Sequence, residues 1–337
     1  MIILRRAANL CIIIRMENNN ILFTCASFFA GVGGIDKGFE NANNFKTIYA
    51  NEFDEKACAT FELNFDIKVD CRDINVVKNS EIPKFDVMLA GFPCQAFSIA
   101  GYRQGFDDEK GRGTLFFELI RIIKAKKPKV IFLENVKNLV GHDGGNTFRI
   151  ILEYLMQCGY FVKYQVLNAK EFGNVPQNRE RIYIVAFKSK KAFQRFEFPK
   201  PIELTTQLSD VINFNKKVDE KYYYTKENCF FYDELIKNMK SSKTVYQWRR
   251  VYVRENKSDV CPTLTANMGT GGHNVPLIKT KQGIRKLTPK ECFNLQGFPS
   301  EFKLPEIAST HLYKQAGNSV VVSVIQRIAE NIYEAIK

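Results

Sequence analysis

The stretch GFPCQAFS, residues 91–98, decides how the rest of the sequence is interpreted. The four apolar residues before it, 87–90, predict a short buried strand. Gly91 and Pro93 restrict the turn that follows, so Cys94 would stand at the carboxyl end of that strand. Open α/β sheets keep their chemistry at this edge. The alternative is a structural cysteine buried in the core, a common state for a free thiol.

A glycine-rich turn lies between the first strand and the first helix that the sequence predicts. The strand starts at residues 21–23 and leads to FFAGVGG, residues 28–34, before a helical pattern. Such a turn lets a ligand approach the backbone and the helix N-terminus. The dinucleotide fingerprint G-x-G-x-x-G would begin at Gly31 and Gly33, but Asp36 stands at its third glycine. A plain tight turn is the alternative.

Acidic residues follow the next two predicted strands. The strand over residues 47–50 leads to Glu52 and Phe53, and the strand that starts at residue 67 leads to Asp73. Nucleotide sites often hold a pair of ribose hydroxyls with an acid after the second strand. A surface glutamate beside a core phenylalanine is the alternative. Two acids at strand ends, after a glycine turn, favour a cofactor that carries a nucleoside.

Three more charged residues are predicted near the edge that carries Cys94. A buried strand over residues 130–133 ends at Glu134, whose alternative role is to cap a helix. Arg179 and Arg181 would point to the same side of an extended chain. That arrangement suits the binding of an anion or the orientation of a base, although two exposed arginines are the alternative.

The second half of the sequence changes in composition near residue 188. Residues 190–281 are polar, aromatic and basic, with little helical or strand period. Within them YQWRRVYVR, residues 246–254, alternates rings with cations, which can stack on bases and contact phosphates. A small β-rich domain with an amphipathic face would show the same mixture.

Helix signals return near the C-terminus. Thr288 is predicted to cap a helix that has Pro289 in its first turn, with Glu291 completing a capping box. Residues 315–320 are predicted to open a last helix that runs through Ile332.

Composition narrows the possible function classes. The chain has 337 residues, enough for a large α/β domain and a smaller one. Its formal net charge of +13 suits a nucleic-acid partner and, equally, a solvated basic surface. No apolar run has the length of a membrane span. Nine cysteines without a CxxC pair or an export signal predict a reducing cytoplasm, and three scattered histidines predict no metal site.

In this order, the motifs resemble those of the cytosine-5 DNA methyltransferases. FAGVGG, residues 29–34, is similar to the cofactor loop of that family, and residues 91–98 are similar to its nucleophile motif. Any one motif is weak, but six in sequence are specific, and the resemblance spans about residues 20–337. The later motifs match at residues 134–136, 177–181, 285–299 and 315–320.

The resemblance implies a Rossmann-like α/β fold, S-adenosylmethionine as the cofactor, and double-stranded DNA as the partner. This cofactor has no pyrophosphate, which fits the incomplete fingerprint. Glu52 would take the ribose hydroxyls and Asp73 the adenine amino group. The cofactor-binding residues that the resemblance implies are Phe29, Gly31, Gly33, Glu52, Phe53, Asp73, Ile74, Pro93, Leu115, Asn318 and Val320.

The resemblance also implies the reaction. Cys94, as a thiolate, would add to carbon-6 of a cytosine flipped out of the duplex, so that carbon-5 can attack the sulfonium methyl group. Glu134 would hydrogen-bond ring nitrogen-3 and the amino group. Arg179 and Arg181 would orient the base or brace Glu134. Loss of the carbon-5 proton would then release Cys94, under a lid formed by residues 99–113.

The resemblance suggests how the chain divides. Residues 20–195 with 312–337 would form the catalytic domain, and residues 196–311 an irregular, β-rich target-recognition domain with a hinge. Residues 1–19 would be an extension, partly disordered, in which Met16 offers a second start. The residues predicted to contact DNA are Arg103, Gln104, Trp248, Arg249, Arg250, Arg254, Thr263 and Leu264.

Two departures from the family pattern do not touch the chemistry: Ser27 stands where many members have aspartate, and Arg72 where glycine is frequent. A tRNA cytosine-5 methyltransferase is disfavoured, because that branch has proline where Phe92 stands. A DNA-binding relative without catalytic activity is disfavoured because Cys94, Glu134 and Arg179 are intact. A nicotinamide dehydrogenase is disfavoured because Asp36 stands at the third glycine of the dinucleotide fingerprint. We expect a monomer, in a bacterial cytoplasm, that protects a short DNA site from a restriction enzyme.

Overall fold

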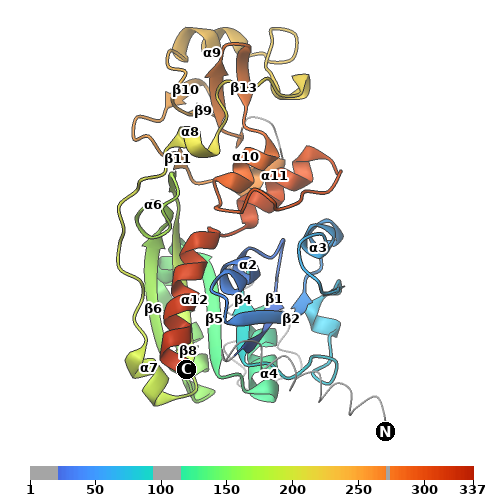
Figure 1. Ribbon diagram of the computed structural model, residues 1–337, viewed down its shortest axis with the longest axis vertical. Coiled ribbons are helices and arrows are strands. Elements are labelled where there is room, and N and C mark those ends of the chain that lie inside the picture. The colour runs from blue at the N-terminus through green and yellow to red at the C-terminus, as the bar shows by residue number, and fades with distance from the viewer. Residues whose placement is uncertain (1–21, 94–114, 271–273) are drawn as a thin grey trace.

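A central sheet of seven strands organises the larger part of the molecule (Figure 1). The computed structural model describes residues 22–93, 115–270 and 274–337. The first five strands of the sheet run parallel, and β8 runs antiparallel to both its neighbours. In their order across the sheet the strands are β3 (Val69–Asp70), β2 (Phe45–Asn51), β1 (Phe23–Phe28), β4 (Val87–Ala90), β5 (Val130–Val136), β8 (Glu180–Phe187) and β6 (Phe161–Asn168).

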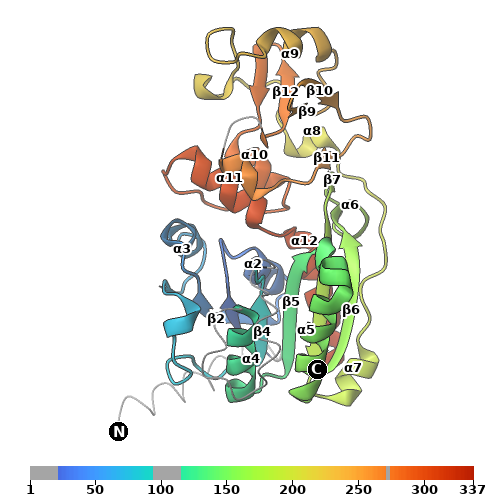
Figure 2. The ribbon, with the colours of Figure 1, turned by 180° about the vertical axis from the view of Figure 1, so that it is seen from behind.

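Helices cover both faces of this sheet, as Figures 1 and 2 show from opposite sides. Helices α2 (Gly34–Asn41) and α12 (Val322–Ile336) pack on one face, and α4 (Leu115–Lys126) and α5 (Asn146–Gln157) on the other. Strand β4 is therefore buried at every position. The predicted Rossmann-like α/β fold is confirmed. Among the helices of the described residues, none has the length and apolar character needed to cross a membrane. The other helices of this part are α3 (Glu55–Glu62), η1 (Ile74–Val76), η4 (Lys137–Gly145), α6 (Ala169–Phe172) and α7 (Lys190–Arg195).

The carboxyl ends of the central strands meet at one edge of the sheet. Strand β1 lies between β2 and β4, so the order of the strands reverses there. The segments that follow these strands begin at Phe29, Glu52 and Gly91, and they come together at this edge. Parallel sheets bind ligands at such a switch point.

A smaller antiparallel sheet lies at the opposite end of the molecule from α7 (Figure 1). Its strands have only four residues each, too few to establish a period, which explains why the sequence showed so little pattern here. Helix α9 (Tyr232–Asn238) packs on it through the buried Leu235. Short turns α8 (Leu208–Val211) and η5 (Glu220–Tyr222) precede this helix. In order, the strands are β10 (Tyr252–Glu255), β9 (Tyr246–Arg249), β12 (Leu277–Thr280) and β13 (Gly283–Lys286).

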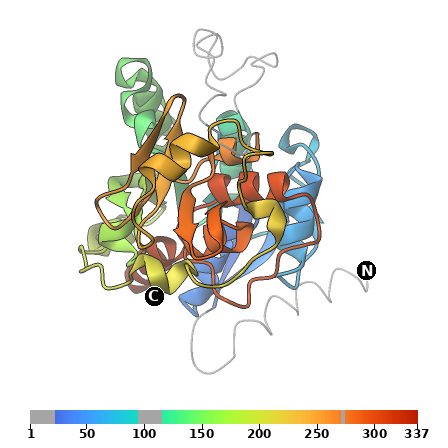
Figure 3. The ribbon, with the colours of Figure 1, turned by 90° about the horizontal axis from the view of Figure 1, so that it is seen from above.

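A layer of helices joins the two sheets, and Figure 3 views the molecule from the end that carries the small sheet. It contains α10 (Pro289–Asn294), α11 (Ser309–Asn318) and η6 (Ala266–Gly269). Beside it, β7 (Gln177–Asn178) pairs with β11 (Cys261–Pro262). Helix α11 approaches η6 so closely that a Cβ on Gly317 would lie 2.1 Å from the carbonyl carbon of Thr265.

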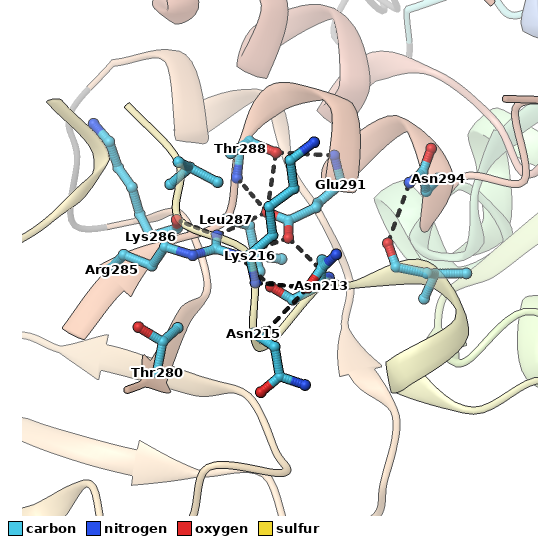
Figure 4. Close-up of polar contacts among 12 residues, drawn as sticks. Asn213, Asn215, Lys216, Thr280, Arg285, Lys286, Leu287, Thr288, Glu291 and Asn294 are labelled. Carbon is cyan, nitrogen blue, oxygen red and sulfur yellow. Dashed lines mark hydrogen bonds and ion pairs between the residues drawn. The ribbon is translucent and has the colours of Figure 1, made fainter. Parts of the chain in front are cut away.

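The start of α10 is the capping box that the sequence predicts. The Thr288 hydroxyl accepts from the Glu291 N–H, and the Glu291 carboxylate accepts from the Thr288 N–H. The same carboxylate binds both terminal nitrogens of Arg285 at 2.8 Å, and this guanidinium also donates to the carbonyl of Asn213 (Figure 4). The buried pair therefore fastens the small sheet to α10.

The predicted last helix is wrong in one respect. Residues 315–318 end α11 instead of opening a helix, and residues 319–321 separate α11 from α12. The physical reason is that the carbonyls of Gly317 and Ser319 accept hydrogen bonds from the guanidinium of Arg179. These carbonyls therefore bond to a side chain and not to the next turn of a helix.

Candidate active site

A cavity of about 490 Å³ opens at the carboxyl edge of the large sheet, next to α11. This volume lies in the range of sites for small ligands. Its described lining joins the glycine turn, the end of β2, the residues before Cys94 and the end of β5. The predicted site residues that line it are Phe29, Gly31, Glu52, Phe53, Pro93, Leu115, Glu134, Arg179, Arg181, Asn318 and Val320.

The glycine turn presents its backbone to the cavity. Gly31 has φ +56° and an added Cβ would meet nothing within 4 Å, so glycine is present here for its conformation. Phe29 also has a positive φ, 54°, which is strained for a residue with a side chain. Strained backbone of this kind concentrates at ligand sites.

Glu52 is a carboxylate fixed by backbone donors. It accepts from the N–H groups of Gly31, Phe53 and Asp54 at 2.9, 2.9 and 3.0 Å. A carboxylate oxygen has more than one acceptor direction, so ligand hydroxyls can still donate to it. The neighbouring Phe53 ring is 72% exposed and also lines the cavity. A fixed carboxylate beside an exposed ring suits a ribose and its base.

Glu134 and Arg181 form a largely buried ion pair across two strands. In the β5–β8 register Arg181 lies opposite Val136, so Glu134 is its diagonal neighbour on the same face. The Nε of Arg181 is 3.1 Å from Oε1 of Glu134. Burial raises the pKa of Glu134, although both nearby arginines oppose the shift. Within the described residues Oε1 makes no hydrogen bond, so this carboxyl retains the capacity to bind a ligand.

Arg179 contacts backbone instead of Glu134. Its Nη1 donates to the carbonyl of Leu264 at 2.7 Å, and its Nη2 donates to those of Gly317 and Ser319. Burial and the nearby Arg181 lower the pKa of its guanidinium to about 9, so it stays charged at neutral pH. Of the two predicted arginines, Arg181 is therefore the one placed against Glu134, and Arg179 joins α11 to the segment before η6.

Cys94 lies outside the described residues, and the chain before it can be followed as far as Pro93. The side-chain amide of Asn135 donates to the carbonyl of Phe92 at 2.7 Å, in a buried position. This bond fixes the turn that leads to Cys94 against the strand that carries Glu134. The sequence indicated no separate role for Asn135. The signal that it offered was the position of Asn135 directly after Glu134, within the motif at residues 134–136.

Three predicted cofactor residues do not line the cavity. A Cβ on Gly33 would lie 2.3 Å from the ring of Phe65, so this glycine is required for packing. Ile74 is 2% exposed and belongs to the core below α4. Asp73 is exposed and accepts from the Asn75 N–H at 2.9 Å, at the start of η1. Neither Gly33 nor Ile74 is therefore placed to contact a ligand in this cavity.

The predicted DNA contacts separate into exposed and buried groups. Arg249, Arg250 and Arg254 are exposed on the β9–β10 hairpin. Trp248, in contrast, stacks on Phe231 with ring centroids 4.0 Å apart. Its ring is partly buried and packs against the core of the small sheet. Arg103 and Gln104 lie outside the described residues.

The predicted Thr263-Leu264 pair also has an internal role. The Leu264 side chain is 1% exposed and packs in the core. Its N–H donates to the side chain of Gln177, and its carbonyl accepts from Arg179. The Thr263 hydroxyl donates to the carbonyl of Asn178 at 2.6 Å.

The contacts that close the cavity were missed from the sequence. Lys314 of α11 forms an ion pair with Asp54 at 3.0 Å, and both line the cavity. Gln315 donates to the carbonyl of Lys56 at 2.9 Å and accepts from the Thr60 hydroxyl at 3.0 Å. Helix α11 is thereby joined to α3 beside Glu52. No local pattern signals contacts between residues about 260 positions apart.

The lining fits S-adenosylmethionine, the cofactor that the resemblance implies. Glu52 offers acceptors for ribose hydroxyls, Phe53 offers a ring for the adenine, and the Gly31 turn gives close access to backbone. Asn318 and Val320 approach from the end of α11. Glu134 lies in the same cavity, so a methyl donor and a base could meet there.

Comparison with known proteins identifies relatives across nearly the whole chain. Residues 23–334 match the model of the family described as C-5 cytosine-specific DNA methylase. Type II methyltransferase M.Bsp6I of Bacillus sp. (strain RFL6) is 64% identical over 310 residues, which cover 92% of this chain and 98% of that protein. Type II methyltransferase M.HhaI of Haemophilus parahaemolyticus is 39% identical over 317 residues, covering 90% and 92%.

Solved structures show the same fold. A crystal structure of Spodoptera frugiperda DNMT2 matches with a TM-score of 0.69 at 20% identity, covering 92% of this chain and 99% of that one. The fold, the cavity that brings the predicted site residues together and the family match all agree with the order of the motifs. The chain belongs to the C-5 cytosine-specific DNA methylases, the S-adenosylmethionine-dependent enzymes that methylate carbon-5 of cytosine in DNA.

Proposed function

We propose that this chain methylates one cytosine within a short, specific sequence of double-stranded DNA, through a covalent bond from Cys94. We further propose that it is the modification enzyme of a restriction–modification system, acting as a monomer in a bacterial cytoplasm. The similar proteins named Type II methyltransferases support this role. The observation that carries the residue roles is the single cavity that joins Glu134 and Arg181 to Glu52 and the glycine turn.

In this proposal Glu134 holds the target base. Addition of a thiolate at carbon-6 places negative charge on ring nitrogen-3 of cytosine. A carboxyl group that keeps its proton can donate it to that nitrogen, and burial raises the pKa of Glu134 in this direction. Arg181, whose Nε lies 3.1 Å from Oε1 of Glu134, would fix the orientation of the carboxyl. The base and the carboxyl meet in a water-poor site, where such hydrogen bonds contribute most.

The other rim of the cavity would hold the cofactor. When bound, S-adenosylmethionine supplies an electrophilic methyl group. Glu52 would accept from its ribose hydroxyls, and Phe53 would cover its adenine. Asp73, exposed near the same edge, would reach the adenine amino group. Gly33 and Ile74 would act by packing below this rim, without touching the ligand.

DNA recognition would fall to the β9–β10 hairpin. Arg249, Arg250 and Arg254 are exposed there, and Val251 and Tyr252 are 81% and 55% exposed. Arginines can pair with phosphates and guanine edges, while apolar groups contact thymine methyl groups. Trp248 would support the hairpin from below, and Leu264 would position Arg179.

Radiolabelled methyl transfer tests the proposed function. The purified chain should label duplex DNA and leave tRNA unlabelled, and bisulfite sequencing of DNA from expressing cells should identify one short site. The Cys94→Ala variant should bind DNA but transfer no methyl group. Labelling of tRNA instead of DNA would favour the RNA-modifying alternative. Specific binding without any transfer by the intact chain would favour the silent DNA-binding relative.

A further inference from the structure

Two cysteines lie next to Glu52, outside the residues that line the cavity. Cys58 belongs to α3, and Cys71 follows β3 directly. Their Sγ atoms are 2.6 Å apart, although both thiols are free. A disulfide bond is about 2.05 Å long, so only a small movement separates the pair from a covalent bond. Cysteine pairs that oxidise inside reducing cells are usually redox-sensing or catalytic.

The two thiols differ in access. Cys71 is exposed, whereas Cys58 is 5% exposed. Burial and the neighbouring Cys71 raise the pKa of Cys58. An oxidant from solution would therefore react first at Cys71, and Cys58 would complete the bond from inside.

The pair is connected to the cofactor side of the cavity. The Cys58 thiol donates to the carbonyl of Glu52 at 3.4 Å, and its neighbour Ala57 lines the cavity. On the other side, the amide of Asn51 donates to the carbonyls of Asp70 and Arg72, both at 2.9 Å, and so holds the backbone around Cys71. A bond between the two sulfurs would remove the thiol donor from Glu52 and tie α3 to the end of β3.

We propose that Cys58 and Cys71 form a reversible disulfide that weakens cofactor binding. The Cys71 thiolate attacks a low-molecular-weight disulfide and expels one thiolate. Cys58 loses its proton and attacks the Cys71 sulfur of the mixed disulfide, which expels the second thiolate. Two cysteine thiols are oxidised, and the small disulfide is reduced to two thiols. The link to affinity rests on the proposed placement of the cofactor at Glu52.

Peptide mapping tests bond formation. The full chain is incubated with glutathione disulfide, alkylated and digested with trypsin. The wild type and the control Cys158→Ser should both yield peptide 57–68 linked to peptide 69–72. Cys58→Ser should keep glutathione on Cys71, and Cys71→Ser should form no link. Wild-type chain that accumulates glutathione on Cys71 without the link would overturn the proposal.

Calorimetry tests the effect on affinity without using methyl transfer, which oxidation of Cys94 would confuse. Loss of the Cys58 bond to the Glu52 carbonyl would displace Glu52 and weaken about one hydrogen bond from its carboxylate to the ribose. The linked form should therefore bind S-adenosylmethionine about three- to tenfold more weakly than the reduced form, and dithiothreitol should restore the affinity. Cys71→Ser should not respond to the oxidant. An unchanged Kd in the linked chain would overturn the coupling.

A separate variant distinguishes this failure from a failure of the proposed cofactor site. Glu52→Gln should weaken binding in the reduced chain. An unchanged Kd for Glu52→Gln would overturn the placement of the cofactor and, with it, the proposed coupling. The mapped disulfide would remain as an independent result.

Discussion

In the proposed function the edge of the large sheet carries the chemistry and the β9–β10 hairpin recognises DNA, and the two regions are built in opposite ways. At the edge, Glu52 and Glu134 are 9% and 8% exposed and each is held by neighbouring groups. On the hairpin, Arg249 and Arg250 are exposed, and Val251 is 81% exposed. Chemistry needs groups whose positions are fixed before the ligand arrives, whereas recognition needs side chains that can reach a surface. Variants should therefore act on rate and folding at the edge, and on DNA affinity at the hairpin.

The largest effect is expected at the Glu134–Arg181 pair. Arg181→Met should lower single-turnover methyl transfer about a hundred- to a thousandfold, because Glu134 loses its orienting partner. Arg181→Lys keeps the charge but lacks the planar guanidinium, so its single-turnover rate should lie between those of the wild type and Arg181→Met. The Kd for S-adenosylmethionine, measured by calorimetry, should change less than about threefold. A loss of cofactor affinity as large as the loss of rate would show that the base-binding side of the cavity and the cofactor-binding side do not act independently.

The second effect concerns the contribution of Asp36, in α2 just after the glycine turn, to the stability of the fold. Asp36 is fully buried and accepts from the hydroxyls of Ser27 and Thr47 at 2.9 and 3.0 Å. Burial raises its pKa from 3.8 to about 7. Because the folded-state pKa is the higher one, the stability that Asp36 contributes is present below pH 3.8 and is lost as the pH rises through 7.

Asp36→Asn removes this titration. The free energy of unfolding of the wild type, relative to the variant, should therefore fall by about 3 kcal/mol between about pH 5 and about pH 8. Urea denaturation of both proteins at the two pH values measures this. A difference that does not change with pH would show that Asp36 is ionised throughout and that the edge does not depend on a protonated acid.

The third effect tests how closely α11 must approach. Gly317→Ala would place a Cβ 2.1 Å from the Thr265 backbone, so the contact that carries Asn318 to the cavity must open. We expect a loss of about 2 kcal/mol in the free energy of unfolding. Gly141→Ala is the matched control, because a Cβ there meets nothing within 4 Å. Equal midpoints in urea for both variants would contradict the account of this contact.

The smallest effect is expected on the hairpin. Arg250→Ala should weaken binding to the target DNA sequence about tenfold. It should also reduce the slope of log Kd against the logarithm of the salt concentration by about one. Arg195→Ala, an exposed arginine of α7, is the control and should bind as the wild type does. Fluorescence anisotropy at several salt concentrations measures both. Reduced cofactor affinity in Arg250→Ala would show that the hairpin and the edge are coupled.

The sequence predicted the edge far better than the hairpin, for a physical reason. At the edge, one short strand carries Glu134 near its end, and others are followed at once by the glycine turn or by Glu52, so local order along the chain already encodes position in space. The small sheet has four-residue strands, so no period distinguishes a packed ring from an exposed one. The sequence therefore did not reveal that Trp248, which is predicted as a DNA contact, also stacks on Phe231.

Other features that the sequence did not reveal are contacts between distant segments. Asn135 bonds to a carbonyl 43 positions away, and Lys314 pairs with Asp54 across 260 positions. Arg179 was predicted as a group that touches the base or Glu134, but its partners lie 85 to 140 positions along the chain. The break between α11 and α12 follows from those same bonds. Such positions are set by how the sheets and helices close on each other, which a linear pattern does not contain.

Covalent trapping tests the central claim, that Cys94, Glu134 and the cofactor site converge on one base. A duplex with 5-fluorocytosine at the target position is incubated with the chain and S-adenosylmethionine, because fluorine cannot leave carbon-5 as a cation and the adduct persists. We predict a stable DNA adduct on tryptic peptide 85–103, which contains Cys94, and much less of it with Arg181→Met. An adduct on any other peptide, or methyl transfer that survives Cys94→Ala, would contradict the account.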